Sequence, residues 1–143
     1  MGQGRNSIYL ARQGWTVTGY DISAAGLARA RTDAQKAGVR IDAVEATHEN
    51  FDFGKERWDL IVMSYSLVNM QDTALLTRIK QSLRPGGIVV LEQANAGGEG
   101  KGPANALIRS FEDLRILRYE DVVDVAEWSR KPQRLGRIVA QKD

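Results

Sequence analysis

The sequence predicts an α/β fold with three layers, built on a mostly parallel sheet and closed by an antiparallel C-terminal hairpin. Two observations carry this prediction. Segments with helical spacing of apolar residues alternate with short β-rich runs along most of the 143 residues, as in parallel sheets whose strands are joined by crossover helices. Near the C-terminus, by contrast, the β-rich runs 115–128 and 135–141 are joined by a polar turn containing Pro132, which indicates a hairpin.

Four elements are expected in the first half of the chain: a short helix, a strand, a longer helix and a second strand. They span 7–13, 15–20, 24–37 and 39–46. Gly14 stops the first helix, and Asp21 follows the first strand. Ser23 is the expected N-cap of the longer helix and Gly38 its terminator, because these residue types favour those two positions.

The second half begins with the run 58–65, which is apolar almost throughout, as expected for a strand covered on both faces. Asp72 caps the next predicted helix, which the segment 84–87 breaks before a strand over 88–92. Residues 95–102 form a glycine-rich loop, and Pro103 starts a last helix. The apolar faces of these two helices contain Leu75, Leu76, Ile79 and Leu83 in the first, and Ala104, Leu107, Ile108, Phe111 and Leu114 in the second.

Composition excludes several classes of protein. The 20 basic and 18 acidic residues nearly balance, which predicts neither a nucleic-acid partner nor a membrane partner. The basic residues between 130 and 142 fit a solvated hairpin. The absence of cysteine excludes disulfides and thiolate metal sites. No apolar run approaches the roughly 20 residues of a membrane span and no signal-peptide pattern opens the chain, so a cytoplasmic location is expected.

A glycine turn and a carboxylate lie in the order that nucleotide-binding folds use. Gly2-Gln3-Gly4 precedes the first helix, and Asp21 ends the next strand. Glycines let backbone amides approach a ligand closely, and a helix N-terminus favours an anionic group. An acidic residue at the end of the strand that follows such a turn and helix can accept hydrogen bonds from ribose hydroxyls. Each feature alone also fits a tight turn or a cap, but the pair in this order predicts a nucleotide-like ligand.

The wider sequence resembles the class I, Rossmann-like methyltransferases that depend on S-adenosylmethionine (SAM), especially small bacterial ones that act on small molecules. The resemblance rests on the segments GQGRNSIYLARQGWTVTGYDIS, WDLIVMSY, the turn LRPGG before IVVLEQ, and the C-terminal hairpin, and it covers nearly the whole chain. It implies SAM as cofactor and a small-molecule methyl acceptor as partner.

The resemblance also assigns cofactor-binding residues. These are Gly2, Gln3, Gly4, Asp21, Ile22, Thr47, His48, Ser64 and Tyr65. The glycine turn would line the methionine portion of SAM, and Asp21 would hold the ribose with Ile22 against the adenine. Thr47 stands where the family often has an aspartate beside the adenine ring, and the backbone amide of His48 would serve there too.

No residue of the sequence stands out as catalytic, and no metal site is expected. Ser64 and Tyr65 would flank the transferable methyl group. His48 is the only histidine, and a single histidine without a partner forms no catalytic constellation. This fits direct displacement, because the sulfonium of SAM is already an activated electrophile and the protein has mainly to align the nucleophile and exclude water.

Two other functions fit parts of the sequence. A NAD-dependent oxidoreductase would also use Gly-x-Gly followed by an acidic residue, although it usually has a third glycine where Ser7 stands. A non-catalytic, degenerate nucleotide-binding module is the second. The resemblance further suggests that residues 1–143 form a methyltransferase domain without its first strand, because in the family a β-strand precedes the glycine loop. The 143-residue chain is therefore expected to be less stable, or to bind SAM less well, than a longer form.

Overall fold

The computed structural model describes residues 1–66, 68–94, 105–126 and 129–143. It divides into two compact units, 1–52 and 53–143, and each unit is described here by itself. Within the described ranges, every helix is too short or too polar to cross a membrane.

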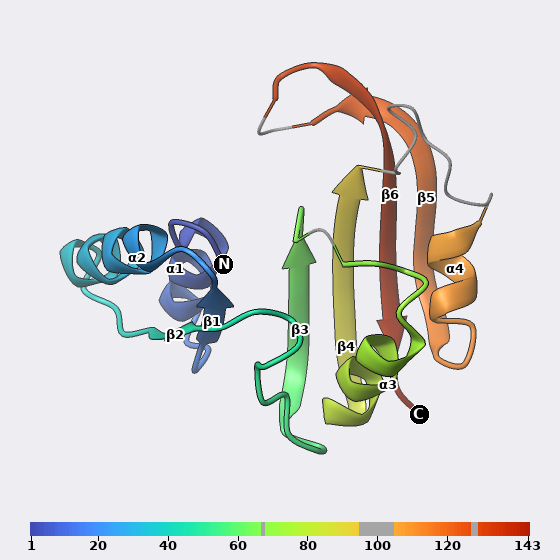
Figure 1. Cartoon of the computed structure of the whole chain (residues 1–143), viewed down its shortest axis with the longest axis horizontal. Coiled ribbons are helices and arrows are strands. Elements are labelled where there is room, and N and C mark those ends of the chain that lie inside the picture. The colour runs from blue at the N-terminus through green and yellow to red at the C-terminus, as the bar shows by residue number, and fades with distance from the viewer. Residues whose placement is uncertain (67, 95–104, 127–128) are drawn as a thin grey trace. The chain divides into compact units, whose positions relative to one another are not determined.

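The first unit pairs two parallel strands with two helices (Figure 1). Its elements are α1 (Arg5–Arg12), β1 (Thr18–Asp21), α2 (Ala24–Lys36) and β2 (Asp42–Glu45). Strand pairing runs from Thr18 opposite Asp42 to Asp21 opposite Glu45, so the carboxyl ends of both strands lie at the same end of the sheet. The buried apolar side chains of this unit are Leu27, Ala30, Ala34, Ala43, Ala46 and Phe51.

Local signals set the ends of α2 as predicted. The Ser23 hydroxyl accepts a hydrogen bond from the Gly26 amide at 3.1 Å, and Gly38 has the left-handed φ of 69° that ends the helix. The Val39 amide then donates to the Ala34 carbonyl at 3.1 Å. Because Val39 closes the helix, it cannot join the ladder, and the predicted strand 39–46 is shortened to Asp42–Glu45.

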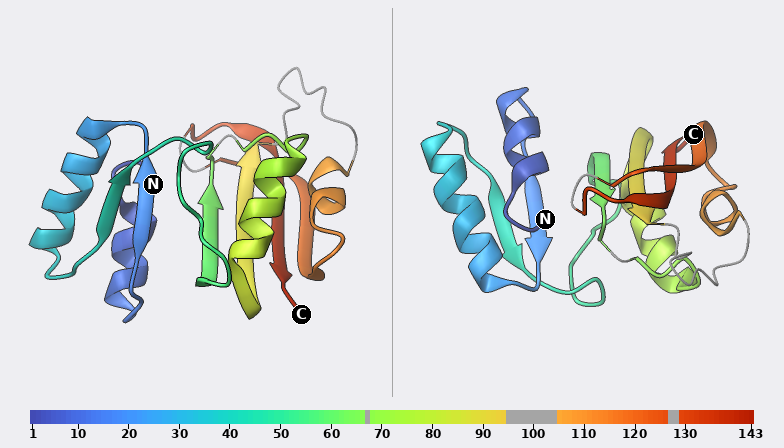
Figure 2. Two further views of the ribbon diagram at one scale, coloured as in Figure 1. Left: turned by 60° about the horizontal axis from the view of Figure 1, so that its bottom comes forward. Right: turned by 90° about the horizontal axis from the view of Figure 1, so that it is seen from above.

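The second unit is a four-stranded sheet in the order β3-β4-β6-β5, in which β3 and β4 are parallel and the other pairs antiparallel. Helices α3 and α4 lie on the same face of this sheet (Figure 2). The β5–β6 pair confirms the predicted hairpin, although Pro132 begins β6 and does not lie in the turn. The elements are β3 (Trp58–Ser64), α3 (Thr73–Ser82), β4 (Leu83–Ala94), α4 (Ala106–Ser110), β5 (Arg115–Val125) and β6 (Pro132–Gln141).

Helix α3 stops at Ser82, before the segment 84–87, as predicted, but this segment is not a turn between the helix and the strand. It is the irregular start of β4. Gly86, at φ 77°, donates its amide to the Lys142 carbonyl at 2.8 Å. A Cβ on Gly87 would lie 2.8 Å from the Arg84 carbonyl oxygen and 2.9 Å from that of Trp58. Both glycines therefore let the backbone of β4 stay close to its neighbours.

Two further expectations are corrected. Strand β3 is not covered on both faces, because Met63 on one face is buried whereas Val62 on the other face is 39% exposed. Helix α4 covers only five residues, since β5 begins at Arg115. Leu107 and Phe111 are buried as predicted, whereas Leu114 lies beyond the helix. The predicted loop 95–102, Pro103, Ala104 and Trp128 lie outside the described residues.

The N-cap of α3 gives a first testable prediction. The Asp72 carboxylate accepts a hydrogen bond from the Leu75 amide at 2.9 Å, which satisfies an otherwise unpaired donor of the first turn. Asp72→Ala is expected to lower the free energy of unfolding by about 1 kcal/mol, measured by urea denaturation. Asp72→Asn keeps an acceptor at the cap and should lose much less; equal losses in the two variants would contradict the capping role.

Candidate functional site

Asp21 is the centre of the site in the first unit. Its Oδ2 accepts hydrogen bonds from the Gly2 amide at 2.6 Å and from the Met1 amino group at 3.0 Å, and Oδ1 accepts one from the Ser23 amide at 3.0 Å. A carboxylate offers about four acceptor positions, so these three donors leave one on Oδ1. Asp21 can therefore accept a hydrogen bond from a ligand hydroxyl without losing its place in the turn.

The same contacts keep Asp21 ionised. Partial burial raises the pKa of its carboxyl group, but the hydrogen bonds from the Gly2 and Ser23 amides and the positive Met1 amino group outweigh burial and lower the pKa from 3.8 to about 2. An anionic acceptor is the form that binds ribose hydroxyls.

A pKa that is lower in the folded state than in the unfolded state makes stability depend on pH. The contribution of Asp21 is complete above its unfolded pKa of 3.8 and is lost as the pH falls from there to about 2. We expect the free energy of unfolding of the wild-type chain to fall more steeply over this window than that of Asp21→Asn, measured by urea denaturation at successive pH values. Parallel pH profiles for the two proteins would contradict this.

The two glycines of the turn have different roles. Gly2 has φ 56°, and a Cβ built on it would meet no atom within 4 Å. Gly4 has φ 82°, and its Cβ would lie 2.8 Å from that of Ala30 in α2. Gly2 thus leaves open space beside Asp21, whereas Gly4 permits close packing of the turn on α2.

Two flanking side chains of this turn are open to a ligand. Gln3 is exposed between the two glycines, and Ile22, directly after Asp21, is 72% exposed. A large apolar side chain in this position could pack against the flat face of an aromatic ligand.

Residues after β2 lie beside Asp21. The Ala46 amide donates to the Asp21 carbonyl at 3.1 Å, which places the residues after Ala46 at the same end of the sheet as Asp21. Thr47 forms a reciprocal turn with Asn50: its amide donates to Asn50 Oδ1 at 2.7 Å, and its hydroxyl accepts from the Asn50 amide at 3.3 Å. The Thr47 amide is thus occupied by a hydrogen bond within the turn.

The His48 ring is held by an aromatic cluster. Its Nδ1 lies 2.8 Å from the Tyr20 hydroxyl in a hydrogen bond, and the Tyr20 ring stacks on buried Phe51 with centroids 4.1 Å apart. The sequence does not predict that Tyr20 contacts His48 or that Asn50 pairs with Thr47. The Tyr20–His48 pair spans 28 residues, so no local pattern marks it, although Asn three residues after Thr is a turn signal.

The remaining two predicted residues end β3 in the second unit. Ser64 pairs with Glu92 of β4, and the Tyr65 amide donates to the Glu92 carbonyl at 2.8 Å. Tyr65 has φ 51°, a left-handed backbone that is rare for an aromatic residue and that clusters at functional sites. The nine predicted residues thus fall into two groups: seven around Asp21 and His48 in the first unit, and Ser64 with Tyr65 in the second.

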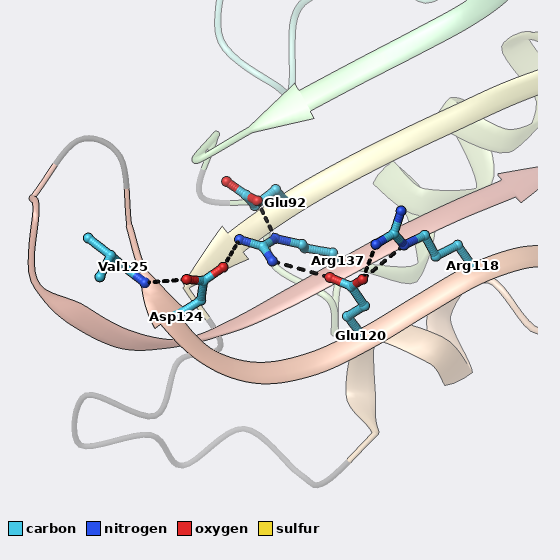
Figure 3. Close-up of polar contacts among 6 residues, drawn as sticks. All are labelled: Glu92, Arg118, Glu120, Asp124, Val125 and Arg137. Carbon is cyan, nitrogen blue, oxygen red and sulfur yellow. Dashed lines mark hydrogen bonds and ion pairs between the residues drawn. The ribbon is translucent and has the colours of Figure 1, made fainter.

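An ion cluster in the second unit was also missed (Figure 3). Arg137 contacts three carboxylates, those of Glu92, Glu120 and Asp124. Its hydrogen bonds to Glu92 first, and then to Asp124 and Glu120, raise the pKa of Arg137. The alternating charges are visible in the sequence, but the strand register that joins them is not. In the described part of the chain, no group of three potential ligands could hold a metal ion.

Three features of the first unit fit the chemical groups of SAM. Asp21 offers an ionised carboxylate with one acceptor position left for ribose, Gly2 leaves open space for the ligand beside the backbone, and exposed Ile22 offers an apolar contact for adenine. These residues would hold the cofactor by its sugar, amino-acid and adenine parts.

Comparison with known proteins identifies the family. Residues 1–87 match the family model described as methyltransferase domain. The chain is 33% identical over 93 residues to an uncharacterized methyltransferase of Synechocystis, covering 63% of this chain and 42% of that protein. It is 30% identical over 128 residues to a ubiquinone biosynthesis O-methyltransferase of Rhizobium leguminosarum, covering 85% of this chain and 50% of that protein. The chain thus spans half or less of these relatives.

Solved structures confirm the Rossmann-like fold. TehB from Haemophilus influenzae has a TM-score of 0.84 at 20% identity, covering 99% of this chain and 55% of that one. A putative S-adenosylmethionine dependent methyltransferase from Listeria monocytogenes has a TM-score of 0.77 at 15% identity, covering 99% and 87%. The family match shows that this chain belongs to the methyltransferase domain family, and the solved structures agree with it in fold.

Proposed function

We propose that this chain binds SAM through the Asp21 site and serves, as one domain over residues 1–143, to transfer a methyl group to a small-molecule acceptor. The observation that carries the proposal is the Asp21 carboxylate. It is ionised, fixed by three donors and left with one acceptor position at the end of β1.

The proposed roles follow the two groups of residues. In the first unit, Gly2, Gln3 and Gly4 would lie along the methionine portion of SAM, and Asp21 would bind the ribose. The adenine would lie against Ile22, beside the turn that contains Thr47 and His48. In the second unit, Ser64 and Tyr65 would lie beside the methyl group.

The chain's own part in the reaction is alignment. SAM supplies an activated methyl group on a sulfonium, so no protein nucleophile is needed. Asp21 and the glycine turn would fix the cofactor, which turns methyl transfer from a random encounter into a reaction between aligned partners. The left-handed backbone of Tyr65 would set the direction in which its side chain meets the acceptor.

The acceptor class is proposed from the relatives. Several of them are named ubiquinone biosynthesis O-methyltransferases, a name that places their acceptor among small molecules. The near balance of basic and acidic residues in this chain also gives no reason to expect a nucleic-acid acceptor. The family match favours SAM over NAD, the ligand of the rival oxidoreductase hypothesis.

Calorimetric titration of the full chain with SAM, and separately with NAD, tests the cofactor. Binding of SAM without binding of NAD is expected, and the reverse would overturn the proposal. Release of S-adenosylhomocysteine in the presence of a small phenol, amine or thiol then tests transfer. Cofactor binding with no release for any of the three classes would favour the non-catalytic module.

A further inference from the structure

One polar row crosses all four strands of the second unit. Strand pairing places Ser64 of β3 opposite Glu92 of β4, Glu92 opposite Arg137 of β6, and Arg137 opposite Glu120 of β5. The row two residues away along the strands is mostly aliphatic, with Val62, Val90, Val139 and Arg118 in the same order. The polar row therefore stands out on an aliphatic surface and ends at Ser64.

Arg137 of β6 contacts carboxylates on both neighbouring strands, β4 and β5 (Figure 3). Its Nε donates to Glu92 Oε2 at 2.5 Å, Nη1 to Glu120 Oε2 at 3.2 Å and Nη2 to Asp124 Oδ2 at 2.9 Å. Arg137 and Glu92 are half-buried, with side-chain exposures of 30% and 29%. The planar guanidinium donates in three directions at once, which a lysine ammonium on its flexible stem cannot reproduce with the same geometry.

The contacts of Arg137 set the orientation of Glu92. Oε2 is held by the arginine, whereas Oε1 has no hydrogen bond to any side chain in the described ranges. Glu92 lies at the carboxyl end of the parallel pair β3–β4, which is where open α/β sheets bind ligands. The left-handed backbone of Tyr65 turns the chain out of the ladder at the same point.

We propose that Arg137 is a positioning residue that holds the Glu92 carboxylate beside Ser64, where Glu92 accepts a hydrogen bond from the O–H or N–H group of the methyl acceptor. This inference rests on the proposed function and narrows its acceptor class. A carboxylate only accepts hydrogen bonds, so it selects acceptors that carry a donor. Arg118 also pairs with Glu120, so the cluster has three carboxylates against two arginines. This excess of negative charge disfavours an acceptor with a carboxylate of its own.

A pair of probes isolates this hydrogen bond. Catechol carries two O–H donors, and 1,2-dimethoxybenzene has the same ring without them. With the full chain saturated with S-adenosylhomocysteine, we expect catechol to bind about 10-fold more tightly than the ether, since a hydrogen bond to a charged group typically contributes such a factor. The two dissociation constants are measured by NMR titration.

Three variants test whether Glu92 and Arg137 cause the preference for catechol over the ether. Glu92→Gln and Arg137→Lys should each reduce the preference for catechol to less than about 3-fold, because the charge or the geometry of the acceptor is lost. Arg134→Ala is the matched control. Arg134 lies on the same hairpin and pairs with Asp121 at 2.6 Å, but it is outside the row, so this variant should keep the full preference. Loss of stability alone would weaken both probes together and leave their ratio unchanged.

Each outcome has a defined meaning. The absence of a preference in the wild-type chain, or its full retention in Glu92→Gln or Arg137→Lys, would overturn this inference. Failure of S-adenosylhomocysteine to bind would overturn the proposed function itself and this inference with it. Binding of S-adenosylhomocysteine with equal affinity for the two probes would overturn only the role of Glu92 and Arg137.

Discussion

Gly4→Ala is expected to lower the free energy of unfolding by about 2 to 5 kcal/mol. A left-handed backbone costs a residue with a Cβ roughly 1 to 2 kcal/mol, and Gly4 has φ 82°. The added methyl would also lie 2.8 Å from the Cβ of Ala30, in a helix that cannot move without disturbing its buried face. Overpacking of this kind costs about 1 to 3 kcal/mol more.

Gly14→Ala separates the two effects. Gly14 has a similar φ of 88°, and a Cβ added to it would meet no atom within 4 Å, so only the backbone cost of about 1 to 2 kcal/mol applies. Urea denaturation followed by circular dichroism measures both variants. Equal losses for Gly4→Ala and Gly14→Ala would show that the turn does not pack on α2 as described.

Asp21→Asn is expected to raise the dissociation constant for SAM by about 10- to 100-fold. Hydrogen bonds to charged groups contribute roughly 1.5 to 3 kcal/mol, and asparagine keeps the size of the side chain while removing its charge. Isothermal titration, well below the melting temperature of the variant, measures the effect on binding apart from any effect on stability.

Asp33→Asn is the matched control for this prediction. Asp33 pairs with Arg29 at 2.6 Å within α2, both side chains are partly exposed, and Asp33 is not one of the nine residues of the proposed site. Its substitution should leave the dissociation constant within about twofold of the wild type, since surface ion pairs contribute little. Equal weakening by Asp21→Asn and Asp33→Asn would show a general effect of charge and contradict a direct contact of Asp21.

Local signals made much of the fold predictable. Ser23, Gly38 and Asp72 cap or end their helices as the sequence indicates, because capping depends on hydrogen bonds within a few residues. The order of the glycine turn and Asp21 along the chain was also enough to predict a nucleotide-like ligand. Sequence could not separate the role of Gly2 from that of Gly4, since the difference depends on the distance to α2.

Features that depend on strand register were not predictable. The start of β4 at Leu83 depends on the backbone contact of Gly86 with Lys142, far along the chain. The polar row around Arg137 likewise exists only because three separate strand pairings align its members. A shift of one residue would turn every side chain of a strand to the opposite face, so spacing in the sequence alone cannot identify such a row.

A crystal structure of the full chain with S-adenosylhomocysteine would show whether Asp21 binds the ribose of the cofactor. We predict that a ribose hydroxyl of the ligand donates to Asp21 Oδ1, with the amino-acid end of the ligand along the backbone at Gly2 and the adenine against Ile22. A ligand bound elsewhere, or an Asp21 carboxylate that contacts only Gly2, Ser23 and the Met1 amino group while the ligand is present, would contradict it.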